Sequence, residues 1–143
     1  MNHYISILIA DDDADDAAFL NEAISQHLRS YQVFYAKDGA QTLRFLRTNP
    51  VPELIFLDLE MPLRNGLECL KAIKEMPELE NTRVVIYAAS HNYRDIDKAY
   101  KSGADFYIVK PVTLNAMSNI IGKLLEALGK PKGEITSRSV CID

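Results

Sequence analysis

Short apolar runs alternate with longer amphipathic segments along nearly the whole chain, and this alternation restricts the fold more than any other feature. The runs are too short for helices and lie at residues 4–10, 32–36, 54–57, 84–88 and 106–109. Several are apolar at almost every position, as expected of parallel strands that helices cover on both faces. The pattern therefore predicts five parallel strands.

The segments between these runs carry apolar residues at helical spacing. The last segment is the clearest, because one stripe holds Leu114, Met117, Ile121, Leu124 and Leu128. Boundary signals agree with this pattern: Asp38 and Gly39 open the second helix, and Thr113 can cap the fifth. Strict strand-helix alternation predicts an α/β fold, a doubly wound parallel sheet with right-handed crossovers in a three-layer α/β/α arrangement.

The length of 143 residues suits a single domain. Helical periodicity ends at Leu128, and the segment after it gains Gly, Pro and Ser. We therefore expect a domain over residues 1–128 and a loose C-terminal tail over residues 129–143.

Charge and hydropathy exclude several classes of protein. A net charge of −4 argues against a direct nucleic-acid binder, which is normally basic. No stretch reaches the roughly 18 apolar residues that a membrane span needs. The N-terminus has no basic leader or small-residue cleavage site, so we expect a cytoplasmic protein with no membrane contact.

Charged side chains follow three of the predicted strands. Residues 11–13, all aspartates, come after the first strand, Asp58 after the third, and Lys110 after the fifth. In open α/β sheets, ligands bind beyond the carboxyl ends of the strands, at a single edge. These side chains should therefore meet there.

A cluster of this kind needs a cation, because neighbouring carboxylates repel one another. Magnesium prefers oxygen ligands and often binds through one or two carboxylates together with phosphate oxygens. Beside such an ion Asp58 is a plausible nucleophile that can form an aspartyl phosphate. Each residue alone has an ordinary explanation, as a turn, a helix cap or a dipole partner, and only their meeting at one edge favours the chemical one.

Three segments resemble the signature blocks of the response-regulator receiver domain of two-component signalling. They read ILIADDD, LIFLDLEMPLRNGLECL and GADFYIVKP, and the resemblance covers about residues 3 to 128. It implies the flavodoxin-like fold of the chemotaxis regulator, with strand order 2-1-3-4-5.

The resemblance also implies roles for the clustered residues. Asp58 would accept the phosphoryl group. Asp12, Asp58 and the backbone carbonyl of Glu60 would bind Mg²⁺ directly, and Asp11 would act through water. Lys110 would contact the phosphoryl oxygens.

The residues expected to transmit the signal depart from the family pattern at one position. Tyr107 corresponds to the aromatic switch, and a cis peptide is expected before Pro111. The hydroxyl residue that normally ends the fourth strand is replaced by Ala88, and the nearest hydroxyl belongs to Ser90. Because a hydrogen bond to a charged group contributes roughly 1.5–3 kcal/mol, its loss should weaken the conformational response.

The sequence thus predicts a stand-alone response regulator that is not an enzyme. It would accept phosphate from a histidine kinase or phosphotransfer protein and act by contact with a downstream protein. The resemblance assigns kinase contact to the first helix, and the output or homodimer surface to the fourth helix, fifth strand and fifth helix.

Two alternatives stay open at this point. One is a pseudo-receiver scaffold with weakened switching, which Ala88 supports. The other is a magnesium-dependent phosphohydrolase, for which Asp11 and Asp13 would form the D-x-D motif, although the chain is short for a cap domain.

Overall fold

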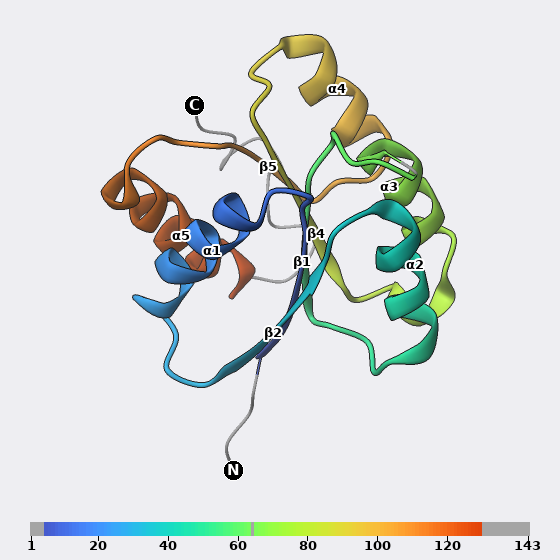
Figure 1. Cartoon of the computed structure of the whole chain (residues 1–143), viewed down its shortest axis with the longest axis horizontal. Coiled ribbons are helices and arrows are strands. Elements are labelled where there is room, and N and C mark those ends of the chain that lie inside the picture. Colours follow the sequence, from blue (N-terminus) through green and yellow to red (C-terminus); the bar gives the residue numbers. More distant parts are fainter. Residues whose placement is uncertain (1–4, 64, 130–143) are drawn as a thin grey trace.

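A five-stranded parallel sheet forms the centre of the computed structural model, which describes residues 5–63 and 65–129 (Figure 1). Its strands are β1 (Ile5–Ala10), β2 (Tyr31–Ala36), β3 (Leu54–Leu57), β4 (Arg83–Ala88) and β5 (Phe106–Val109). They lie in the order β2-β1-β3-β4-β5, and every pair is parallel. The predicted fold class and strand order are confirmed, with β2 and β4 each beginning one residue earlier than expected.

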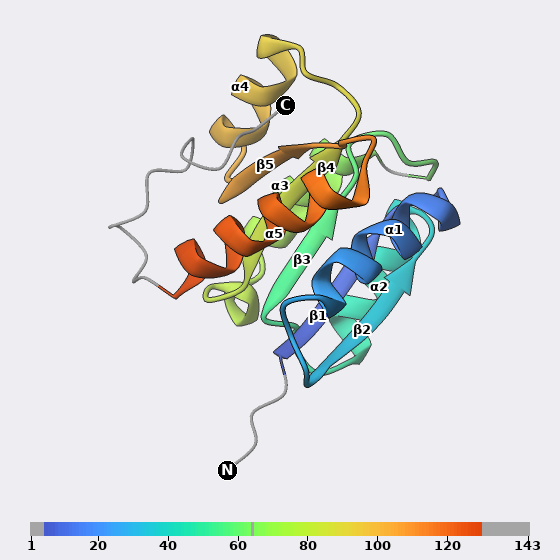
Figure 2. The same cartoon turned by 90° about the vertical axis from the view of Figure 1, so that its left-hand side faces the viewer.

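Five α-helices cover both faces of the sheet, four of them between successive strands and the fifth after β5 (Figure 2). They are α1 (Ala14–Ser25), α2 (Gly39–Thr48), α3 (Gly66–Lys74), α4 (Tyr93–Lys101) and α5 (Leu114–Leu128), with a short 3₁₀ turn at Pro77–Leu79. Asp38 and Thr113 cap α2 and α5, as the sequence predicted. Asp13 caps α1 by accepting hydrogen bonds from the backbone amides of Asp15 and Asp16.

The core consists of two layers, one on each face of the sheet. Helices α1 and α5 cover one face of the sheet, and α2 and α3 cover the other (Figure 1). Alternate residues of β1 point to opposite faces, so Ile7 packs with α1 and α5 while Leu8 packs with α2 and α3. Strands β3 and β5 are buried at every position. Burial on both faces explains why these runs are apolar throughout instead of alternating.

Backbone hydrogen bonds continue the sheet past the strand ends. The amide of Asp11 donates to the Ala36 carbonyl at 3.0 Å, and the amide of Asp58 donates to the Ala10 carbonyl at 2.9 Å. The amide of Lys110 donates to the carbonyl of Ala88 at 2.8 Å. The residues after β1, β3 and β5 are therefore fixed at one edge by the sheet itself.

One expectation from the family resemblance is wrong. The peptide before Pro111 is trans, and no cis peptide occurs within residues 5–63 and 65–129. The trans isomer is favoured by about 0.5–1 kcal/mol before proline, and only the resemblance predicted otherwise. Apart from Gly129, which caps α5, the predicted tail lies outside the described residues. None of the helices described is long and apolar enough to cross a bilayer.

Candidate functional site

An open pocket of about 1040 Å³ lies at the carboxyl edge of the sheet. Loops after β1, β3, β4 and β5 supply its walls, and its lining includes Asp12, Asp16, Asp58, Glu60, Ala88 and Lys110. These residues meet at the edge where the strand-end rule predicted that they would. Four of these six side chains are carboxylates and one is an ammonium group, so the pocket is strongly charged.

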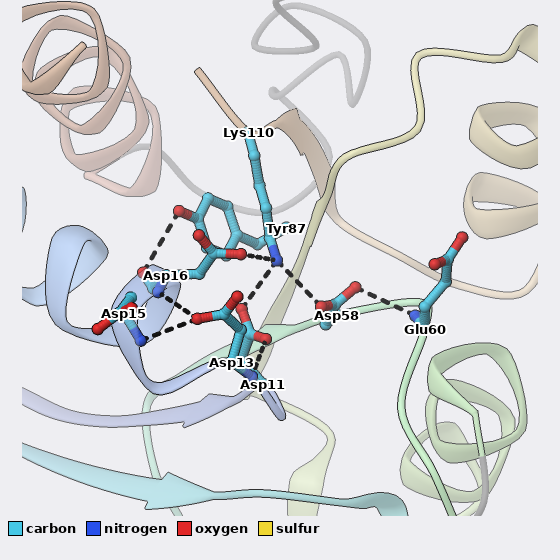
Figure 3. Close-up of polar contacts among 8 residues, drawn as sticks. All are labelled: Asp11, Asp13, Asp15, Asp16, Asp58, Glu60, Tyr87 and Lys110. Carbon is cyan, nitrogen blue, oxygen red and sulfur yellow. Dashed lines mark hydrogen bonds and ion pairs between the residues drawn. The ribbon is translucent and has the colours of Figure 1, made fainter. Parts of the chain in front are cut away.

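Lys110 lies at the centre of this charge. Its Nζ is 2.9 Å from Oδ2 of Asp11, 2.9 Å from Oδ2 of Asp16 and 3.0 Å from Oδ2 of Asp58 (Figure 3). The Lys110 side chain is 13% exposed, and those of Asp11 and Asp58 are 0% and 8% exposed. Ion pairs this far from bulk water are screened less than surface pairs.

The ring of Tyr87 in β4 also contacts the Lys110 ammonium. The Lys110 ammonium lies 4.9 Å from the centroid of the Tyr87 ring, within range of a cation–π interaction. Burial by itself would lower the pKa of Lys110, but hydrogen bonds to Asp16, Asp11 and Asp58 outweigh it and raise the pKa above its usual value. Lys110 is therefore a fixed positive charge at neutral pH.

Three carboxylates of the pocket form a candidate metal site. Asp11, Asp12 and Asp58 each offer an oxygen, and these oxygens all lie within 4.8 Å of one another. Burial raises the pKa of Asp11 to about 6, although hydrogen bonds from the Asp13 amide and Lys110 oppose this shift. Asp12 is exposed, which leaves room for water ligands. An all-oxygen, partly solvated donor set of this kind suits Mg²⁺.

The Asp58 carboxylate is held through both of its oxygens. Oδ2 pairs with Lys110, and Oδ1 accepts a hydrogen bond from the backbone amide of Glu60 at 3.1 Å (Figure 3). Glu60 thus lies beside Asp58, as expected, with its side chain exposed at the pocket wall. The four residues predicted to carry the chemistry, Asp11, Asp12, Asp58 and Lys110, are brought together.

The sequence model of one protein family, the response regulator receiver domain, matches residues 7–122 of this chain. The chain belongs to this family. Receiver domains are signalling domains, and membership supports a role in phosphorylation-dependent signalling.

Individual relatives agree with this assignment. Response regulator Rcp1 of Synechocystis sp. is 28% identical over 121 residues, which are 80% of this chain and 82% of Rcp1. Sporulation initiation phosphotransferase F of Bacillus subtilis is 33% identical over 119 residues, 83% of this chain and 92% of the relative. Other relatives are longer, and the chain spans only 24% of one and 51% of another.

Solved structures of receiver domains closely resemble the structure of this chain. The phosphorylated cyanobacterial phytochrome response regulator RcpA superposes with a TM-score of 0.81 at 28% identity, covering 90% of this chain and 96% of RcpA. The Mn²⁺-bound form of Rcp1 gives a TM-score of 0.76 at 25% identity, covering 94% of this chain and 99% of Rcp1. RcpA is phosphorylated in its structure, and Rcp1 binds Mn²⁺ in its structure.

The predicted switch residues of this receiver lie on the neighbouring strands β4 and β5. Ala88 is the last residue of β4, and it shares a core layer with Tyr107. Tyr107 is 0% exposed, and its hydroxyl donates to the Ser90 carbonyl at 2.8 Å. The Ser90 hydroxyl in turn donates to Oδ2 of Asp95, in the first turn of α4, at 2.6 Å. The ring thus faces inward, and Ser90 joins the β4–α4 loop to α4.

Sequence reasoning missed two residues of the receiver site. Asp16 pairs with Lys110, and Tyr87 lies under it. A signal for Asp16 was available, because residues 11–16 read DDDADD and a cap at Asp13 puts Asp16 in the first helical turn beside the pocket. Tyr87 gave no signal, since it sits within an apolar strand where tyrosine is an ordinary core residue.

Proposed function

We propose that this receiver accepts a phosphoryl group on Asp58 in a Mg²⁺-dependent reaction and signals through contacts with other proteins. One observation carries the proposal: Oδ2 of Asp58 lies 3.0 Å from the ammonium of a half-buried lysine and next to two further carboxylates that can hold a metal ion. That arrangement supplies a nucleophile and the positive charge that phosphoryl transfer requires.

The metal would be held by Asp11, Asp12, Asp58 and the backbone carbonyl of Glu60. A bound Mg²⁺ would neutralise charge on the phosphoryl oxygens and on the surrounding carboxylates. The Mn²⁺-bound form of Rcp1 supports this assignment, because it is a relative of the same fold that binds a divalent cation.

The chain's own residues perform the transfer. A carboxylate oxygen of Asp58 attacks phosphorus, and the bond from phosphorus to the donor's leaving atom breaks, with its electron pair staying on the donor. The donor would be a phosphohistidine of a kinase or phosphotransfer protein, so that the leaving atom is an imidazole nitrogen. Lys110 stays protonated throughout, holding Asp58 before transfer and contacting phosphoryl oxygens after it. The phosphohistidine ring would react with its other nitrogen protonated, so that it leaves as a neutral imidazole, and no residue of this chain needs to act as an acid or base.

We expect phosphorylation of Asp58 to change the conformation of the β4–α4 loop and, through it, the surface that binds the partner. Ala88 and Ser90 line the pocket, and the Tyr107 hydroxyl donates to the Ser90 carbonyl. Asp95 and Lys98 of α4 line the pocket as well, and Asp95 accepts from the Ser90 hydroxyl. A downstream protein would bind over α4, β5 and α5, where a homodimer is an alternative use of the same surface. We expect no catalytic turnover and no direct contact with nucleic acid or membrane.

The decisive experiment is incubation with acetyl phosphate, with and without Mg²⁺, followed by intact-protein mass spectrometry. Wild type should gain one phosphoryl group only when Mg²⁺ is present, and Asp58→Asn should gain none. If wild type binds Mg²⁺ but takes no phosphoryl group, the protein is a scaffold and the proposal fails.

The phosphohydrolase alternative has little support from the site. Its motif would need the Asp13 carboxylate for chemistry, but that carboxylate caps α1 by accepting from the amides of Asp15 and Asp16 at 2.9 and 3.1 Å. Turnover of phosphate esters that survived Asp58→Asn and was lost in Asp11→Asn would favour the hydrolase.

The replacement Ala88→Thr is expected to strengthen the conformational response of the receiver. A hydroxyl at this position could donate to the phosphoryl group, and a hydrogen bond to a charged group contributes roughly 1.5–3 kcal/mol, enough to shift a conformational equilibrium about tenfold or more. The chain has seven tyrosines and no tryptophan, so near-ultraviolet circular dichroism reports on tyrosine surroundings. The phosphorylation-induced change should be larger in Ala88→Thr than in wild type.

Ala89→Thr is the matched control for this experiment. It places the same side chain at the next position, which also lines the pocket but is exposed. An equal spectral change in wild type, Ala88→Thr and Ala89→Thr would show that the missing hydroxyl is not what limits the response.

A further inference from the structure

We infer that Asp16 is a positioning residue that holds Lys110 in the resting protein and gives it up when a phosphoryl group arrives on Asp58. The inference rests on the proposed function. Asp16 belongs to the first turn of α1, and its Oδ2 lies 2.9 Å from Nζ of Lys110 (Figure 3). It would act only through the lysine.

The hydrogen bonds of Lys110 are fully used in the resting protein. An ammonium group has three N–H donors and no acceptor. Three carboxylate oxygens lie 2.9, 2.9 and 3.0 Å from Nζ, and they belong to Asp11, Asp16 and Asp58. A phosphoryl oxygen can therefore reach Lys110 as a full partner only if one of these contacts is released.

Asp16 is the partner that can leave at the smallest cost. The Asp11 side chain is 0% exposed and its Oδ1 also accepts from the Asp13 amide at 2.9 Å, so it is fixed in place and bulk water cannot replace the lysine there. Asp58 carries the phosphoryl group and keeps it near Lys110. The Asp16 side chain is 41% exposed, so water can replace the lysine there.

Release of Asp16 would change the start of α1. Its backbone amide donates to Oδ1 of Asp13 at 3.1 Å, and its carbonyl accepts from the Tyr87 hydroxyl at 3.5 Å. The Lys110–Asp16 pair therefore ties the first turn of α1 to the residue after β5. After its loss, an uncompensated carboxylate would face solvent at the mouth of the pocket, where a phosphodonor protein must approach Asp58.

The resting contact is tested without any phosphorylation by a double-mutant cycle. The unfolding equilibrium is measured for Asp16→Asn, Lys110→Met and the double variant. We expect the two substitutions to be coupled by about two- to fivefold in the unfolding constant, as is typical of partly exposed ion pairs. Asp15→Asn replaces Asp16→Asn in the control cycle, because both residues are acidic and lie in the first turn of α1. Equal coupling in the two cycles would overturn the inference.

The release is tested by phosphorylation with acetyl phosphate and Mg²⁺. Without the Asp16 carboxylate, one N–H donor of Lys110 is available to the incoming group. The donor concentration at half-maximal rate should therefore fall about two- to fivefold in Asp16→Asn. Asp15→Asn removes the same charge from the same helical turn and should lower the half-saturating donor concentration less. Asp16→Glu keeps a carboxylate within reach of Lys110 and should behave like wild type.

Failure of this inference differs from failure of the proposed function. If wild type gains no phosphoryl group, the proposed function is wrong, whereas the double-mutant cycle still reports whether Asp16 holds Lys110. If wild type is phosphorylated and Asp16→Asn and Asp15→Asn lower the half-saturating concentration equally, only the role of Asp16 is wrong.

Discussion

Replacing Lys110 with methionine is expected to slow phosphorylation by acetyl phosphate about a hundredfold, the usual effect of removing one preorganised electrostatic contact to a transition state. Methionine has a similar length but no charge. Lys110 is within 3.0 Å of three carboxylates, so its loss leaves the pocket with uncompensated negative charge that repels the donor. Mass spectrometry over a time course measures the rate.

The same substitution should strengthen metal binding. Lys110 and a bound cation compete for the charge of Asp11 and Asp58, so removing the ammonium leaves these carboxylates to the metal. Slower phosphorylation together with tighter Mg²⁺ binding, measured by titration calorimetry, separates this effect from general damage to the pocket. Lys98→Met is the matched control, because Lys98 lines the same pocket but is exposed. A similar loss of rate in both variants would contradict a special role for Lys110.

Gly66→Ala is expected to lower the free energy of unfolding by about 3 kcal/mol, at the upper end for an overpacked position. A Cβ at residue 66 would clash with the carbonyl oxygen of Asp58 and would lie 2.6 Å from Cα of Leu59. Both neighbours are backbone atoms, so no side chain can turn away to relieve the contact. The loop that carries Asp58 must move, and phosphorylation should decline with stability.

Urea denaturation of wild type, Gly66→Ala and Gly129→Ala measures this effect. A Cβ at Gly129 would lie 3.3 Å from its nearest neighbour, the carbonyl oxygen of Glu126, and its φ of −72° is allowed for alanine. Gly129→Ala should therefore change stability by less than about 1 kcal/mol. Equal midpoints for Gly66→Ala and wild type would contradict the close approach of α3 to the Asp58 backbone.

The sequence predicted the fold well because its strands are buried on both faces. Runs such as 54–57 and 106–109 have no polar positions, and the observed strands have these same bounds. The caps at Asp38 and Thr113 were equally visible, since each precedes a helical stripe. The strand-end rule then placed Asp58 and Lys110 together, although 52 residues separate them along the chain.

The parts that could not be predicted depend on three-dimensional contacts. Whether Asp16 turns toward the pocket depends on where α1 begins, and that is set by the cap at Asp13. Tyr87 lies under Lys110 because β4 is next to β5 in the sheet, a fact that no local pattern contains. The trans peptide before Pro111 was missed because the family resemblance was carried over to a bond whose isomers differ by about 1 kcal/mol.

The position of the phosphoryl group tests the proposed function most directly. The protein is incubated with acetyl phosphate and Mg²⁺ and then treated with borohydride, which reduces an acyl phosphate to an alcohol and so converts a phosphorylated aspartate into homoserine. Peptide sequencing by mass spectrometry should find homoserine at residue 58, with unmodified aspartate at residues 11, 12 and 16. Homoserine at one of those three positions, or phosphate retained on a histidine, would contradict the account.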